Sequence, residues 1–151
     1  MLSLTRTPAP EILEALSHSR FRARFHLSDK LLAYAREKND VLAEHARKLL
    51  NERLAPIGLH GNDGRQTPMK GHPVFVAQHA TALCCRGCME KWYGIDPSRN
   101  LTSDELEAAV QIVLAWIARQ VQSSPAHSAQ KARRAASGGA SALSGRQLSL
   151  F

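Results

Sequence analysis

The chain has 151 residues, of which 44% are hydrophobic, and a formal net charge of +7. That length suits one domain with a moderate hydrophobic core, and no stretch approaches the roughly 20 apolar residues that span a bilayer. The first residues lack the charged start and apolar run of a secretion signal, so we expect a cytoplasmic protein.

Residues 1–18 are predicted to be an N-terminal extension with a helix at about Pro10–Ser17. Arginine and phenylalanine then alternate through Ser19–Phe25, which in an extended chain gives one apolar and one basic face. The basic face would offer phosphate contacts to a nucleic acid through Arg20, Arg22 and Arg24. The alternative is a short packed segment whose arginines lie in solvent.

Two helices are predicted next. Ser28–Asp29 is a good helix start, and Asn39–Asp40 is a plausible break because both residue types prefer caps and turns. A second helix is predicted over about Val41–Leu54, and Pro56 ends it.

Residues 58–71 are predicted to be a loop, because four glycines and one proline among them discourage regular structure. Long loops in compact domains are often functional or disordered, and this loop adjoins the only cysteines of the chain. Its polar side chains, Asp63, Arg65, Gln66 and Thr67, are therefore candidates for a site.

Pro73 suits the first position of a helix that continues to about Leu83. A second short turn or helix is predicted over Cys84–Tyr93, and Gly94 stops it. Arg86, within this segment, is a further candidate for a nucleic-acid contact.

A long amphipathic helix is the clearest element. Thr102 and Glu105 have the spacing of a capping box, and the apolar positions that follow have a helical period: Leu106, Val110, Val113, Leu114, Ile117 and Val121. Trp116, beside this stripe, is predicted to belong to the core. No strand signal is convincing, so residues 19–122 are predicted to form an all-α domain with a Cys/His-containing loop–helix segment.

That segment holds five candidate ligands within seventeen residues, His72, His79, Cys84, Cys85 and Cys88. Zinc prefers four nitrogen or sulfur ligands, and Cys85 and Cys88 have a usual chelating spacing. Three cysteines so tightly clustered suit a reducing compartment better than a disulfide framework. Three interpretations stay open: a metal site (zinc is the candidate), a reactive thiol activated by nearby basic groups, and buried or hydrogen-bonded structural residues.

After about Gln122 the composition changes to Ser, Ala, Gly and Arg. Residues 123–151 hold four basic side chains and no acidic one, so most of the surplus positive charge lies there. Residues 123–146 are predicted to be a flexible, disordered linker, whose root-mean-square span is about 27 Å.

The last five residues, Gln147, Leu148, Ser149, Leu150 and Phe151, resemble the pentapeptide by which bacterial polymerases and repair proteins bind the replication sliding clamp. Every position fits that pattern. The resemblance implies a hydrogen-bonding role for Gln147, apolar contacts by Leu148, Leu150 and Phe151, and a tolerant position at Ser149. The alternative is that these apolar side chains pack back on the body.

Residues from about 20 to 120 resemble a bacterial domain family of unknown function. The motifs that carry the resemblance are GNDGRQTPM, GHPVF, QHAT, CCRGC and EKW, at residues 61–69, 71–75, 78–81, 84–88 and 90–92. The resemblance implies a common fold and brings no activity. Tyr93 stands where that family is expected to have histidine.

Together these features predict an accessory protein of DNA replication or repair that is recruited to the sliding clamp. Its body would contact either DNA, weakly, or a partner protein, and no membrane partner is expected. One alternative is an enzyme acting on nucleic acid or a nucleotide through the Cys/His segment. Another is a metal-stapled interaction module without a DNA role. No catalytic residue is assigned.

Overall fold

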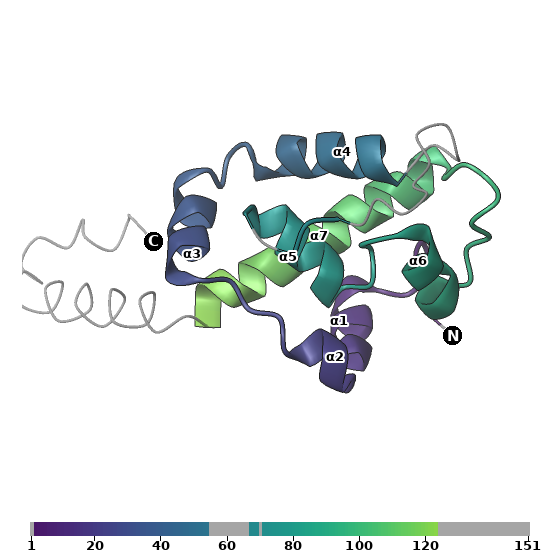
Figure 1. Ribbon diagram of the computed structural model, residues 1–151, viewed down its shortest axis with the longest axis horizontal. Helices are drawn as coiled ribbons and strands as arrows, with labels where there is room; N and C mark the ends of the chain where they lie inside the picture. Colours follow the sequence, from purple (N-terminus) through teal and green to yellow (C-terminus); the bar gives the residue numbers. More distant parts are fainter. Residues whose placement is uncertain (1, 55–66, 70, 124–151) are drawn as a thin grey trace, which may run out of the picture.

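The computed structural model describes residues 2–54, 67–69 and 71–123, and all regular structure in these ranges is helical, which confirms the all-α prediction (Figure 1). The helices are α1 (Ala9–Ser17), α2 (Arg20–Ala23), α3 (Asp29–Glu37), α4 (Leu42–Arg53), α5 (Pro73–Ala80), α6 (Arg86–Tyr93) and α7 (Ser103–Ser123). None of the described helices is both long and apolar enough to cross a membrane.

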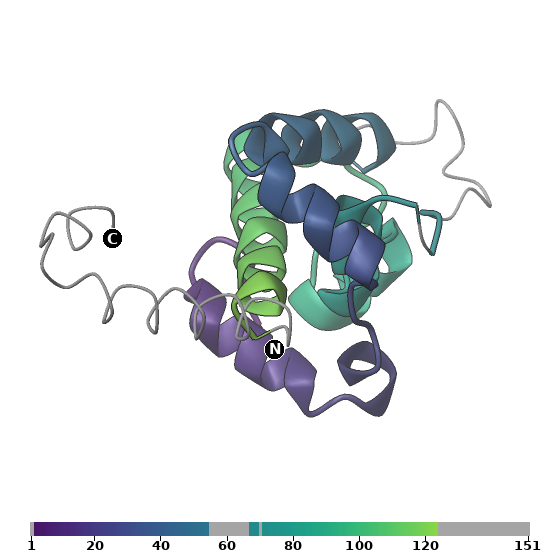
Figure 2. The same cartoon turned by 90° about the vertical axis from the view of Figure 1, so that its left-hand side faces the viewer.

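Helix α7 is the axis of the domain: α1, α3, α4 and α5 all pack against it, with α4 on one side and α1 on the other (Figures 1 and 2). Its predicted capping box is present, because Thr102 Oγ1 accepts from Glu105 N–H and Glu105 Oε1 accepts from Thr102 N–H. Val110, Val113 and Ile117 of the predicted stripe are buried in the core. Trp116 packs against that core and is partly buried.

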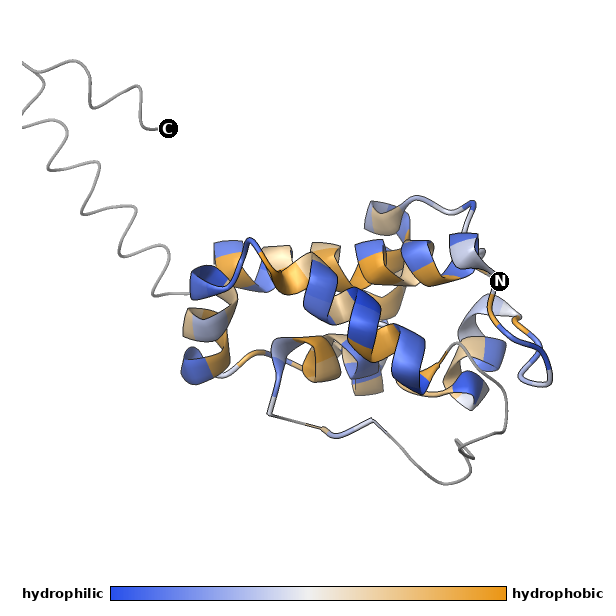
Figure 3. Cartoon of the chain, turned by 90° about the horizontal axis from the view of Figure 1, so that it is seen from above, coloured by the Kyte–Doolittle hydropathy of each residue, from blue (hydrophilic) through white to orange (hydrophobic). Residues whose placement is uncertain are grey.

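The other local signals also produce the helices that they predict. The Ser28 side chain accepts from Leu31 N–H at the start of α3, and Pro73 occupies the first turn of α5. Gly94 ends α6 in the left-handed region with φ of 68°. Orange, hydrophobic faces of the helices turn toward neighbouring helices, whereas blue faces point outward (Figure 3).

The N-terminal segment belongs to the same core. Leu4, Ile12, Leu13 and Leu16 are buried in the cluster that α7 completes, so residue 18 does not separate an extension from the domain. The predicted helix at Pro10–Ser17 is present as α1.

The alternating segment Ser19–Phe25 is not extended, which corrects the two-faced arrangement that its pattern predicts. Residues 20–23 form one helical turn, α2, whose N-cap Ser19 accepts from Arg22 N–H. In a helical turn successive side chains point about 100° apart, so they do not alternate between two opposite faces as they do in a strand. Arg22 consequently points into the domain, where it is 7% exposed, while Arg20 and Arg24 remain exposed.

Candidate functional site

The three cysteines lie where the chain turns from α5 into α6. Ala82 adopts a positive φ of 60° in this turn, and Cys85 is the N-cap of α6, with its sulfur accepting from Cys88 N–H at 3.4 Å. Cys88 follows one helical turn later, so its side chain returns to the side of Cys85. The chain therefore brings all three thiols to the start of α6.

The sulfur atoms of Cys84, Cys85 and Cys88 lie within 4.8 Å of one another, a grouping that could hold a metal ion. Cys84 is buried and the other two are half-buried. Thiolates suit soft or borderline metals such as zinc. The cluster supplies three of the four ligands that a closed zinc site needs.

Arg22 projects from α2 onto this cluster. Its Nη1 donates to the His79 carbonyl at 2.7 Å and lies 3.7 Å from Cys84 Sγ, and its Nη2 lies 3.2 Å from Cys88 Sγ. Among the described residues no carboxylate pairs with this buried guanidinium. Because a buried charge needs a compensating partner, the sulfur atoms are its available counter-charge.

The two cysteines that Arg22 contacts differ in their pKa. The hydrogen bond from Cys84 lowers the pKa of Cys88 to about 4, and Arg22 adds to this effect against burial. The hydrogen bond to Cys88, together with burial, raises the pKa of Cys84. In the metal-free protein Cys88 is therefore the thiolate and Cys84 the thiol that donates to it.

The two histidines, His72 and His79, which the sequence offers as candidate metal ligands, have other partners in the structure. His79 Nε2 is 2.8 Å from the Thr67 carbonyl, and its ring stacks on Phe25. His72 is the N-cap of α5, where Nδ1 accepts from Val74 N–H. Burial, with a smaller contribution from His45, lowers the pKa of His72. Within the described ranges, neither imidazole belongs to the group of ligand atoms that the cysteines form.

The end of the predicted site loop is tied to the cysteine turn. Thr67 Oγ1 donates to the Cys84 carbonyl at 2.7 Å, and Gln78 Nε2 donates to the Leu83 carbonyl at 2.9 Å. Both side chains are buried. Asp63, Arg65 and Gln66 lie outside the described residues, as do the linker and the pentapeptide.

Arg86 holds the backbone rather than facing a ligand. Its Nη1 donates to the Leu54 carbonyl at 3.1 Å, and its Nη2 donates to the carbonyls of Asp96 and Arg99 at 2.9 and 2.6 Å. The side chain is 6% exposed. The nucleic-acid contacts predicted for Arg86 and Arg22 are corrected by these placements, because both guanidinium groups are buried on internal partners.

Sequence reasoning missed the part that Arg22 plays. Its partners lie 57 to 66 residues further along the chain, a separation that no spacing rule covers. Gln78 carried a weak signal, since it is a polar residue that follows the apolar run Pro73–Ala77 within α5. Burial of such a residue requires hydrogen bonds, and the turn at Leu83 supplies one.

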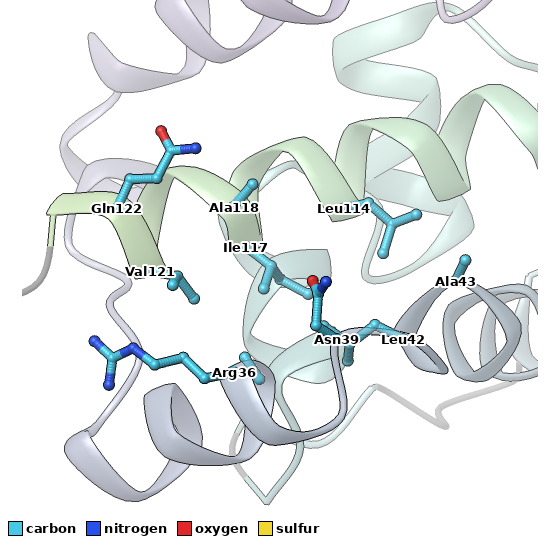
Figure 4. A pocket seen from close by; sticks show the side chains of 10 residues that line it. Arg36, Asn39, Leu42, Ala43, Leu114, Ile117, Ala118, Val121 and Gln122 are labelled. Carbon is cyan, nitrogen blue, oxygen red and sulfur yellow. The ribbon is translucent and has the colours of Figure 1, made fainter. Parts of the chain in front are cut away.

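A hollow lies away from the cysteines, between the C-terminal half of α7 and the α3–α4 corner. It measures about 660 Å³ and is lined by apolar side chains such as Leu42, Leu114 and Ile117, with Asn39 and Gln122 among the polar ones (Figure 4). No cysteine or histidine lines it. Of the cysteine turn and this hollow, only the cysteine turn therefore offers metal ligands.

A family model described as "Domain of unknown function (DUF4186)" matches residues 10–118. The match spans α1 to most of α7 and includes the cysteine turn and Arg22. No solved structure matches the chain.

Proposed function

Since the chain belongs to the DUF4186 family, whose description carries no activity, we propose a function from its residues: it is a cytoplasmic accessory protein of DNA replication or repair that binds the bacterial sliding clamp. The single observation that carries the proposal is the fit of Gln147–Phe151 to the clamp-binding pattern at every position. A full match arises by chance in on the order of one in several thousand chains of this length.

Two further features support the proposal. The pentapeptide lies outside the family match, which ends at residue 118, as an added recruitment signal would. Leu148, Leu150 and Phe151 are apolar residues that follow a stretch rich in Ser, Ala and Gly, a composition that offers them little apolar surface to pack on and so favours an interaction role. So few contacts support an affinity of about a micromolar.

Deleting residues 147–151 is expected to abolish binding to purified clamp. Replacing both Leu150 and Phe151 by alanine should weaken binding at least about tenfold, because each buried apolar side chain contributes on the order of 1.5–3 kcal/mol. Ser149→Ala, at the tolerant position, is the matched control and should stay within about twofold of the parent. Biosensor titration of immobilised clamp measures all four proteins.

Clamp binding that survives the deletion unchanged would contradict the proposal, and so would the absence of binding by the full chain. Equal loss in Ser149→Ala and in the double variant would also count against it, since the resemblance assigns those positions different roles.

A second candidate function is a zinc centre at Cys84, Cys85 and Cys88, and the closeness of the three sulfur atoms favours it. Three thiolates and one Zn²⁺ leave a net charge of −1, and the guanidinium of Arg22 balances that charge inside the domain. Zinc sites with three protein ligands keep a fourth position for water or substrate, whereas closed sites are structural. A zinc centre here is therefore compatible with both alternatives to the accessory protein: an enzyme, if the fourth position stays open, and a metal-stapled interaction module, if it is closed.

Full-length protein purified without a histidine tag is expected to contain about one zinc ion per chain, measured by elemental mass spectrometry. Cys85→Ser and Cys88→Ser should each lower the zinc content at least about tenfold, because hydroxyl groups are poor zinc ligands. His72→Asn, at a histidine outside the cluster, is the control and should keep the metal. Metal-free parent protein would rule out the zinc centre and leave the clamp proposal untouched.

A further inference from the structure

Two large apolar side chains are exposed in the described part of the chain, Phe21 at 44% and Met69 at 47%. Phe21 lies on α2, and Met69 lies just before α5. Arg24 connects them, because its guanidinium lies over the Phe21 ring and its side chain lines a hollow together with Met69. An exposed aromatic ring that carries a guanidinium, near a second exposed apolar side chain, offers both charge and apolar surface to a ligand.

Arg24 is held by aromatic rings rather than by an acid. Its Cζ lies 4.7 Å from the centroid of Phe21 and 5.4 Å from that of Phe25. No carboxylate within the described ranges pairs with it, whereas the exposed Arg47 and Arg99 each pair with a glutamate. The stacked side chain has less conformational freedom to lose when it binds an anion, and its donors stay available.

The hollow beside Arg24 has a one-sided charge. It measures about 520 Å³, and its lining includes Arg24 and His26 from the α2–α3 connection, Lys30 from the first turn of α3, and Met69 and Gly71 from the approach to α5. No aspartate or glutamate of the described ranges lines it. That volume falls within the roughly 300–1,000 Å³ of small-ligand sites. The surroundings suit a ligand with an anionic part and a flat apolar part.

We propose that this surface, formed by Phe21, Arg24, Lys30 and Met69, binds single-stranded nucleic acid. Arg24 and Lys30 contact phosphates. Unstacked bases pack on the exposed part of the Phe21 ring, over which the Arg22 guanidinium also lies, on the guanidinium plane of Arg24 and on Met69. A duplex keeps its bases within the stack and cannot use these apolar contacts. The choice of nucleic acid as the anion rests on the proposed role in replication or repair, and the surface itself requires neither the pentapeptide nor a metal.

The test uses the full chain and a fluorescent oligothymidylate of about 20 nucleotides, at low salt, with anisotropy as the readout. Arg24→Glu is expected to weaken binding at least about tenfold. Lys48→Glu makes the same change in charge on the exposed side of α4, away from α2 (Figure 1), and should weaken binding at most about threefold. Phe21→Leu should weaken binding about tenfold, and Phe21→Tyr should retain it because the ring is kept.

Equal losses in Arg24→Glu and Lys48→Glu would overturn the proposal in favour of general attraction to a basic protein. So would unchanged binding in Phe21→Leu, or tighter binding to duplex of the same length or to phosphatidylglycerol vesicles than to the single strand. Circular dichroism confirms that each variant is folded. Clamp titration of the same variants keeps the outcomes apart, since a protein that binds clamp and ignores the oligonucleotide loses only this proposal.

Discussion

Replacing Arg86 by methionine is expected to lower the free energy of unfolding by about 3–5 kcal/mol. The guanidinium is buried and donates to the carbonyls of Leu54, Asp96 and Arg99. Those carbonyls belong to the end of α4 and to the connection between α6 and α7. Methionine fills much of the space and supplies no donor, so three carbonyl groups lose their hydrogen bonds inside the domain.

Urea unfolding of the full chain at neutral pH measures the change. Arg47→Met is the matched control, because Arg47 makes a two-pronged ion pair with Glu107 in which both side chains are about half exposed. Removing an exposed pair costs at most about 1 kcal/mol. If the two substitutions cost the same, Arg86 does not hold these segments together.

Replacing Arg22 by methionine is expected to raise the pKa of Cys88 in protein stripped of metal. The parent pKa of about 4 owes most to the hydrogen bond from Cys84, and Arg22 adds to it, so the variant pKa should rise toward the usual thiol value without reaching it. A depressed pKa means that Cys88 loses its proton at lower pH than an ordinary thiol does. In the variant, this loss should move to higher pH.

Alkylation by iodoacetamide, located to Cys88 by mass spectrometry, reports the thiolate fraction at each pH. Between about pH 4 and 8, the rate should rise with its midpoint at higher pH in Arg22→Met than in the parent. Arg24→Met changes a neighbouring exposed arginine and should leave the midpoint in place. An unchanged midpoint in Arg22→Met would show that the thiolate does not depend on this guanidinium.

Local signals in the sequence predicted most of the helices. The capping box at Thr102 and Glu105, the Ser28 cap and the stop at Gly94 each act through hydrogen bonds or dihedral angles within a few residues. Such interactions are present in the sequence as fixed spacings. The break that was predicted near Asn39–Asp40 is another such local signal, and it separates α3 from α4.

Long-range contacts could not be predicted in this way. Alternation in Ser19–Phe25 predicts two faces if the segment is extended, but the segment forms a helical turn in which Arg22 contacts the His79 carbonyl and two sulfur atoms. Nothing within residues 19–25 indicates these contacts, because the partners of Arg22 lie more than fifty residues away.

The candidate site was predicted in part. The cysteines share one turn and one short helix, so their spacing was enough to bring them together. His72 and His79 lie in the same stretch of sequence but at opposite ends of α5. His72 caps the start of the helix, whereas His79 forms a hydrogen bond with the Thr67 carbonyl. Sequence proximity does not decide which way a side chain on a buried helix points.

The position of α7 at the centre has a consequence for synthesis of the chain. Helices α1, α3, α4 and α5 emerge from the ribosome first, but each of them rests on α7, which emerges after them. Besides their contacts with α2 and with one another, their apolar faces lack their main native partner until α7 has been made as far as about Ile117. A ribosome that stalls before that point therefore carries an incomplete domain with exposed apolar helix faces, which chaperones and proteases recognise.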